Sequence, residues 1–246
     1  YLERLRQSME IQRSLMEKEL LMESHLKDAQ LKYLQAQINP HFLFNTLNAG
    51  AQLAMMEGAD RTYDYIQNVA DFFRYNVKKG NDIVTLREEL ELIDHYIYIL
   101  NVRFSGDIHY EKEISEDLLD CAVPSMILQP IVENAFLHGI MMKEEKKGSI
   151  LLTGWPEGDD IVFIISDDGA GIPPETLDTL KDDVIAGTGS SASPRHTAFS
   201  GHIGIYNTNL RLKSLYGESY GLSITSTLGK GTEVTVRLPA RHITSD

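Results

Sequence analysis

Cysteine is nearly absent from the sequence, which has Cys121 alone among 246 residues. A single cysteine excludes an intrachain disulfide and a cysteine-based zinc site, and it fits a reducing compartment. Apolar runs of the roughly 18 residues that span a membrane are absent as well, and no signal peptide is visible. Acidic residues outnumber basic ones, and the net charge of −13 argues against nucleic acid or an anionic membrane surface as the main partner.

Glycine and proline are missing from residues 1–39, which are rich in Leu, Met, Glu, Lys and Gln. Apolar residues repeat there with a heptad spacing that shifts once: Leu2, Leu5, Met9 and Met16, then Met22, Leu26, Ala29 and Tyr33. The pattern predicts a helix over residues 1–36 that forms one strand of a parallel coiled coil. A solvated helix packed on its own domain is the alternative. Because the chain opens on Tyr1 in helical sequence, we expect a fragment of a longer protein.

The stretch "QINPHFLFNTLN", residues 37–48, places a histidine directly after a proline. On a helix, neutral polar side chains fall on one narrow stripe: Gln37, His41, Asn45, Asn48 and Gln52. Leu43, Leu47 and Ala54 fall roughly opposite. One interpretation is a core histidine that is hydrogen-bonded to Asn45 one turn on. The other is a stripe with a chemical role.

Two further helices follow this stretch. Pro40 can kink the first helix or start the next one, and "EGADR" at 57–61 indicates a turn, so residues 34–79 are predicted to form a helical hairpin. "TLREELELIDHYIYILNVRF" is predicted to be a third helix, because Thr85 with Glu88 three residues later forms a capping box.

The pattern changes after Gly106. Strand-like runs appear there, namely "IHYEKEI", "SILLTGW", "DIVFIIS", "LSITST" and "TEVTVRLP". Helical segments around 124–139 and 203–216 interrupt them, which predicts a layered α/β domain. Residues 178–201 are rich in Gly and Ser and lack periodicity, so we expect a long mobile loop of the kind that often acts as a lid.

Two stretches of this domain carry side chains suited to a nucleotide. In "DIVFIISDDGAGI", a buried strand ends in Asp167, whose carboxylate can accept a hydrogen bond from an exocyclic amine such as that of adenine. Gly169 and Gly171 let backbone come close to a flat ligand, although a plain turn is the simpler interpretation. In "LQPIVENAFLHGI", a helix predicted to end at Gly139 carries Asn134, an oxygen ligand suited to Mg²⁺. Taken alone, this stretch is more simply interpreted as a polar helix face.

Two other stretches are rich in glycine next to regular structure. "SGHIGIYNTNLRLKSLYG" puts glycines before a helix N-terminus, which offers N–H groups to phosphate. A plain loop–helix junction is the alternative. "GKGTEVTVRLP" is a glycine turn before a terminal strand, and by itself it predicts a hairpin.

In this order and spacing, the four stretches resemble the N, G1, G2 and G3 boxes of the gyrase–Hsp90–histidine kinase–MutL ATP-binding superfamily. "LQAQINPHFLFNTLN", "VTLREELELIDHYIYILNVRF" and "VPSMILQPIVENAFLHGI" resemble the LytS/YesM-type sensor histidine kinases. The resemblance covers roughly residues 30–239, and "NPHFLFN" is its most specific piece. It implies a signalling coiled-coil helix over 1–36, an α-helical dimerisation and phosphotransfer region over 37–105 and a catalytic ATP-binding domain over 106–246. The dimerisation hairpins would form a four-helix bundle in the dimer, and the ATP-binding domain would be an α/β two-layer sandwich of the GHKL (Bergerat) ATPase type.

The resemblance also implies a role for each site residue. His41 would be the phosphoacceptor and nucleophile, with Asn45 orienting its imidazole. Asn134 would hold Mg²⁺, His138 would lie near the phosphates and Asp167 would bind adenine. The remaining nucleotide-binding positions would be Gly169 and Gly171 beside Asp167, Gly201, His202 and Gly204 at the phosphates, and Thr232 closing the adenine side.

Four positions depart from the wider pattern of the superfamily. Asp168 replaces a common Asn in the G1 box, and His202 replaces the first glycine of the G2 pair. Phe42 stands where many histidine kinases have an acidic general base, so the base is unassigned. Pro130 stands where several ATPases have a water-activating glutamate, which argues against hydrolysis as the main activity.

The resemblance implies the cytoplasmic core of a sensor kinase that uses ATP and Mg²⁺, forms a homodimer and phosphorylates an aspartate on a response-regulator receiver domain. It would sit at the cytoplasmic face of the membrane, attached only through segments absent from this chain, and no nucleic acid partner is expected. Two alternatives are an ATP-driven clamp or hydrolase of the same superfamily and a non-enzymatic scaffold that kept the fold. Steady ATP turnover without a phosphoprotein would favour the clamp or hydrolase. Nucleotide titration would show whether the chain is a scaffold that no longer binds ATP.

Overall fold

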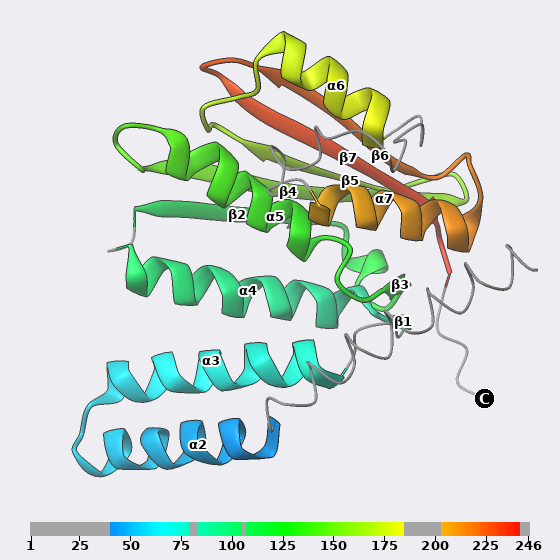
Figure 1. Ribbon diagram of the computed structural model, residues 1–246. Helices are drawn as coiled ribbons and strands as arrows, with labels where there is room; N and C mark the ends of the chain where they lie inside the picture. Colours follow the sequence, from blue (N-terminus) through cyan, green and yellow to red (C-terminus); the bar gives the residue numbers. More distant parts are fainter. Residues whose placement is uncertain (1–39, 79–82, 105–106, 185–202, 242–246) are drawn as a thin grey trace, which may run out of the picture.

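The computed structural model describes residues 40–78, 83–104, 107–184 and 203–241 (Figure 1). The prediction of a coiled-coil helix over 1–36 lies outside these residues. The longer helices of the described chain are α2 (Pro40–Met56), α3 (Asp60–Lys78), α4 (Leu86–Arg103), α5 (Gln129–Asn134), α6 (Pro174–Val184) and α7 (Ile203–Tyr216). None of the described helices has both the length and the apolar character of a membrane span.

Helices α2 and α3 form the predicted hairpin, and Pro40 begins α2. Its fixed φ and missing N–H suit the first turn of a helix. The predicted faces of α2 are confirmed for the described residues. Ala54 is buried and Leu43 and Leu47 are partly buried, whereas the polar stripe is exposed at His41, Asn45, Asn48 and Gln52. In Figure 1, α2, α3, α4 and α5 are stacked in that order.

Helix α4 begins as the sequence predicts. Thr85 accepts a hydrogen bond from the Glu88 N–H, and the Glu88 carboxylate accepts one from the Thr85 N–H, which completes the capping box. On one side, α4 contacts the hairpin, where the rings of Phe72 and Tyr96 stack with centroids 5.6 Å apart. On the other side, five of its apolar side chains join the hydrophobic core of the sheet domain, namely Leu86, Leu90, Ile93, Ile97 and Leu100. The helix therefore bridges the hairpin and the sheet.

The sheet domain is built on a five-stranded sheet with the order β2-β4-β5-β7-β6. Its strands are β2 (Ile108–Ile114), β4 (Gly148–Glu157), β5 (Asp160–Asp167), β6 (Gly221–Thr227) and β7 (Gly231–Pro239). Only β2 and β4 pair in parallel, and the other neighbours are antiparallel. All five strands match the predicted runs to within a few residues, and the glycine turn of "GKGTEVTVRLP" joins β6 and β7 as a hairpin.

One face of this sheet is covered by α5 and α7 (Figure 1). Side chains alternate between the faces of a strand, so Ile161, Phe163 and Ile165 of β5 all point to the covered face and are buried there. Val234 and Val236 of β7 do the same. The result is the two-layer α/β sandwich that the sequence predicts.

The predicted helix over 124–139 is wrong at its start and at its end. Residues 122–124 form β3 (Ala122–Pro124), which pairs with β1 (Ile83–Thr85), and Met126 has a left-handed φ of 58° that a helix excludes. Helical structure therefore begins only at Gln129. It also continues past Gly139, because the π-helical turn η2 (Ala135–Gly139) leads into the 3₁₀ turn η3 (Ile140–Met142).

The predicted loop over 178–201 is wrong for its first part. Residues 178–184 belong to α6, whose Leu177 and Leu180 are buried against the sheet domain. Two leucines three residues apart lie on one helix face, but this short pattern is masked by the acidic residues around it. Residues 185–201 lie outside the described chain, so the lid itself stays a prediction.

Candidate functional site

Asp167 lies at the end of β5 and points to the covered face of the sheet. Residues two apart on a strand point to the same face, so Asp167 points to the same face as Ile161, Phe163 and Ile165, which is the face covered by the helices. The carboxylate lines a pocket that is closed by α5, η2, α6 and α7. The other side chains of this pocket include Ile131, Asn134, Ala135, His138, Ile165, Ile172, Leu180, Ile205, Ile224, Thr232 and Val234. An apolar slot with one carboxylate at its base suits a flat heterocycle that carries an amine.

Glycines make room for the Asp167 carboxylate. A Cβ on Gly139 would fall 2.6 Å from Asp167 Oδ1, so only glycine fits at this point of η2. A Cβ on Gly169 would fall 2.3 Å from the Gly139 backbone. The glycine predicted to end the helix is therefore required by packing, and Gly169 allows backbone to approach backbone. Gly171 has a φ of 68° and approaches the carbonyl of Thr227 in the same way.

The Asp167 carboxylate is held by backbone donors. Gly169 N–H donates to Oδ1 at 2.8 Å, and the Thr232 N–H also favours the ionised form. Burial outweighs these donors and raises the pKa of Asp167 from 3.8 to about 6. Asp168 points elsewhere, because its Oδ1 accepts from Ser149 N–H at 2.9 Å and lies 3.4 Å from Lys143 Nζ.

Binding of an adenine amine to Asp167 should weaken at low pH. A raised pKa means that the carboxylate form, which accepts the hydrogen bond, is lost as the pH falls through about 6. If only this form binds, the affinity at pH 5 should be about tenfold lower than at pH 7. Adenosine is the suitable probe in calorimetry, since it has no phosphate that titrates in this range. An affinity that is constant between pH 5 and 7 would disprove the link.

Asn134, the last residue of α5, presents an oxygen to the same pocket. Its Nδ2 donates to the Pro130 carbonyl oxygen at 2.5 Å, which fixes the carboxamide. Its Oδ1 is buried and has no hydrogen-bond partner within the described residues. An unsatisfied carboxamide oxygen in this pocket fits a Mg²⁺ ion that is otherwise held by phosphates and water.

The other predicted nucleotide-binding residues are only partly brought together. His138 and Thr232 line the pocket, and Thr232 Oγ1 lies 2.9 Å from Ser226 Oγ. Gly204, in the first turn of α7, lies beside Asn134, because a Cβ there would be 3.6 Å from Asn134 Nδ2. Gly201 and His202 lie outside the described residues.

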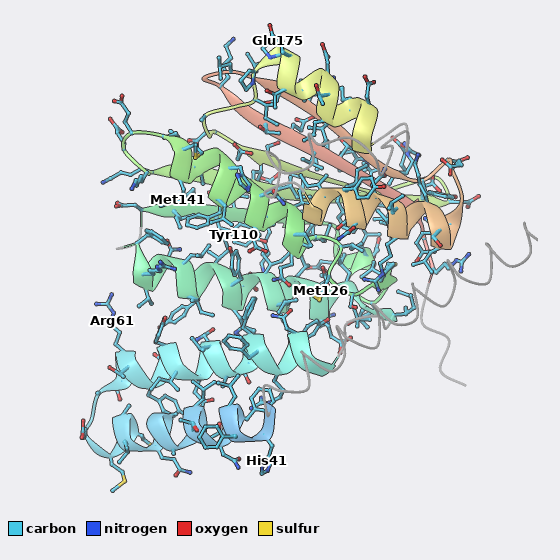
Figure 2. All side chains as sticks on the ribbon, viewed as in Figure 1. His41, Arg61, Tyr110, Met126, Met141 and Glu175 are labelled. Atoms are coloured by element: carbon cyan, nitrogen blue, oxygen red, sulfur yellow. The ribbon has the colours of Figure 1, made fainter. Side chains whose placement is uncertain are left out.

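His41 lies far from this pocket in the stack of helices. Figure 2 shows it at the N-terminal end of α2, on the side of α3 that faces away from the sheet. Its Nδ1 is 3.2 Å from Asn45 Nδ2, one turn on, as expected for an orienting partner. Since His41 is exposed, the interpretation as a core histidine is wrong.

Two sequence families match the chain in tandem. The family described as "Histidine kinase" matches residues 29–108, and the family "Histidine kinase-, DNA gyrase B-, and HSP90-like ATPase" matches residues 123–242. The chain belongs to the histidine kinases. The first match contains His41, and the second contains Asn134 and Asp167.

Sensor kinases of bacteria are similar to this histidine kinase over most of its length. Sensor histidine kinase YesM of Bacillus subtilis is 28% identical over 238 residues, which are 93% of this chain and 36% of that protein. Sensor protein LytS of the same organism is 31% identical over 222 residues, 89% of this chain and 35% of its own. Sensor histidine kinase BtsS of Shigella flexneri is 30% identical over 216 residues, 88% and 34% of the two chains. The chain thus spans about a third of the length of these curated relatives.

The apolar walls of the pocket were not predicted from the sequence. Strand alternation contains the signal for Ile165, which precedes Asp167 by two residues, and for Val234, which follows Thr232 by two. Leu180 and Ile172 come from segments that were predicted to be a loop or a turn. Ser226, whose Oγ accepts from Ile172 N–H at 2.9 Å, lies in a run that was predicted to be a strand, and no local pattern reveals a contact between residues 54 positions apart.

Proposed function

We propose that this chain is the kinase core of a two-component sensor, which transfers the γ-phosphoryl group of ATP to His41 and from there to an aspartate of a response regulator. The observation that carries the proposal is the presence in one chain of an exposed histidine paired with Asn45 and a pocket that offers Asp167 and the unpartnered Asn134 oxygen. Membership of the histidine kinases supports the same assignment.

In the proposed reaction, His41 acts through Nε2. Rotation of the Asn45 carboxamide brings its Oδ1 to the Nδ1–H of the ring, which leaves a lone pair on Nε2. The Nε2–P bond then forms as the bond between the γ-phosphorus and the bridging oxygen breaks, and ADP leaves with the electron pair. The Nδ1 proton must pass to a base, since an amide does not accept it.

In this proposal, the pocket binds both the adenine and the phosphate ends of the nucleotide. Asp167 accepts the adenine amine, and the walls described above cover the ring. Asn134 would contribute an oxygen to Mg²⁺, which when bound neutralises charge on the phosphates. Pro130, at the position of a hydrolytic glutamate elsewhere in the superfamily, supports phosphoryl transfer over steady hydrolysis.

The arrangement of the helices and the exposed apolar side chains of α2 support a homodimer in which the ATP-binding domain moves relative to the hairpin. Because α3 and α4 lie between α2, which carries His41, and α5, which lines the pocket (Figure 1), transfer requires the ATP-binding domain to move or a partner to supply its own. Apolar side chains are exposed on α2, with 70% of Phe42, 60% of Leu53 and 84% of Met56 accessible. Burying them between two hairpins in a four-helix bundle would stabilise the dimer.

The wider context is also part of the proposal. Residues 1–36 would carry the signal as a coiled coil, 37–105 would serve dimerisation and phosphotransfer, and 106–246 would bind ATP. The partner is a receiver domain, and the core would work at the cytoplasmic face of the membrane, attached through segments beyond this chain.

Asn134→Ala should separate the Mg²⁺-dependent step from nucleotide binding. We expect phosphorylation by γ-labelled ATP and Mg²⁺ to fall by at least about tenfold, because the variant lacks the oxygen offered to the ion. ATP affinity in EDTA should change by less than about threefold, because Asp167 and the apolar walls remain. Asn207→Ala, at an exposed position of α7, is the matched control. Unchanged phosphorylation in Asn134→Ala would remove Asn134 from the proposed site.

A further inference from the structure

Glu89 of α4 is a fully buried carboxylate, with 0% of its surface accessible. It faces backbone rather than a basic side chain. Oε2 accepts from Met126 N–H at 2.7 Å, and Oε1 accepts from Leu128 N–H at 3.0 Å and Gln129 N–H at 3.5 Å. Met126 and Leu128 belong to the turn that leads into α5, and Gln129 is the first residue of that helix.

This carboxylate serves as the N-terminal cap of α5. Leu128 stands at the capping position and its side chain makes no hydrogen bond, so α5 has no cap of its own. A helix start leaves N–H groups unsatisfied, and Glu89 supplies the acceptor from another helix. Burial raises the pKa of this carboxyl, and the backbone donors of the turn oppose that shift. Figure 2 places Met126 beside the ends of α4 and α5.

The capped turn is directly connected to Asn134. The carbonyl oxygen of Pro130, one residue after Gln129, accepts from Asn134 Nδ2 and so turns Oδ1 toward the pocket. A shift of the first turn of α5 would move this acceptor and with it the Asn134 oxygen.

Two further elements meet at the same turn. Arg211 of α7 donates to the Ser125 carbonyl at 2.5 Å. On the hairpin side, burial and then the charge of Glu89 raise the pKa of the Tyr75 hydroxyl, so α3 borders the carboxylate as well. Glu89 thus lies where the hairpin, α4 and α5 meet, with α7 anchored to the turn that it caps.

We propose that Glu89 is a positioning residue that fixes the first turn of α5 and thereby holds the Asn134 oxygen in place for Mg²⁺ bound with the nucleotide. The proposal rests on the proposed function for the assignment of Asn134 to the ion. Its readouts are binding and amide exchange, so they stay informative if phosphoryl transfer to His41 is absent.

Glu89→Gln tests the proposal. Gln keeps one acceptor oxygen but turns an NH₂ group toward the N–H of Met126 or Leu128. The ADP affinity in EDTA should stay within about threefold of wild type, while the gain in affinity from Mg²⁺ should fall about tenfold, as for residues that support a metal ligand. Glu91→Gln, at an exposed position of the same helix, should leave both unchanged. An unchanged Mg²⁺ gain in Glu89→Gln would overturn the proposal.

Amide exchange in the unmodified chain gives a second test that does not require the variant to fold. Coupling between two sites is reciprocal, so a Mg²⁺ ion that engages Asn134 should tighten the capped turn. The amides of Met126 and Leu128 should exchange more slowly with ADP and Mg²⁺ than with ADP in EDTA. Equal exchange in the two conditions would overturn the proposal even if Glu89→Gln does not fold.

Discussion

Replacing His41 by Gln is expected to reduce autophosphorylation by at least about 1000-fold, the scale on which the loss of a nucleophile acts. Gln keeps roughly the size and polarity of the exposed stripe on α2 and can still face Asn45. It has no ring nitrogen to attack phosphorus. Because the nucleotide pocket lies beyond α3 and α4, ATP affinity and dimerisation should be unchanged. Label incorporation, calorimetry and sedimentation measure the three properties.

The matched control is His109→Gln, which removes another exposed histidine, from β2, where its Nε2 lies 2.8 Å from Glu111. This variant should phosphorylate as wild type does. Label that persists in His41→Gln would mean that the nucleophile is a different residue and that the polar stripe of α2 has another role.

Asp167→Asn should lower ATP affinity by about 100-fold or more while the domain stays folded. In the wild type, the Gly169 N–H donates to Asp167 Oδ1. In the variant it is expected to donate to the amide oxygen, so the NH₂ group faces the pocket. An adenine amine then meets a donor instead of an acceptor, and both donors are left unsatisfied in a dry site. Calorimetry gives the affinity, and thermal unfolding checks the fold.

Asp168→Asn is the control for this variant, because it makes the same change at the next residue. Asp168 faces Ser149 and Lys143, not the pocket, so its replacement should leave ATP affinity within about threefold of wild type. Wild-type affinity in Asp167→Asn would exclude adenine binding by this carboxylate.

Local patterns account for what could be predicted from the sequence. The capping box of Thr85 and Glu88 involves residues three apart, and the strand over 108–114 matches a run of apolar and polar alternation. His41 and Asn45 are one helical turn apart, so their contact could be predicted once the segment was predicted to be a helix. Asp167, Asn134 and Thr232 were predicted through the family resemblance, because nothing local brings β5, α5 and β7 together.

Contacts between distant segments account for what could not be predicted. The start of α5 depends on the pairing of β3 with β1 and on Glu89, which is 40 residues from Gln129. In the sequence Glu89 is one of several glutamates in α4, and only the fold reveals that it is buried. Gly139 was predicted to end a helix, whereas its small size is required by the Asp167 carboxylate.

The chemistry of the labelled product shows whether His41 carries the phosphoryl group. After incubation with γ-labelled ATP and Mg²⁺, the label should map to the peptide that contains "NPHFLFN". A P–N bond breaks in acid, where the ring nitrogen leaves protonated, and survives in alkali, whereas a serine or threonine ester resists acid. We expect label that is lost at low pH and kept at high pH. Acid-stable label, or label on another peptide, would contradict this expectation.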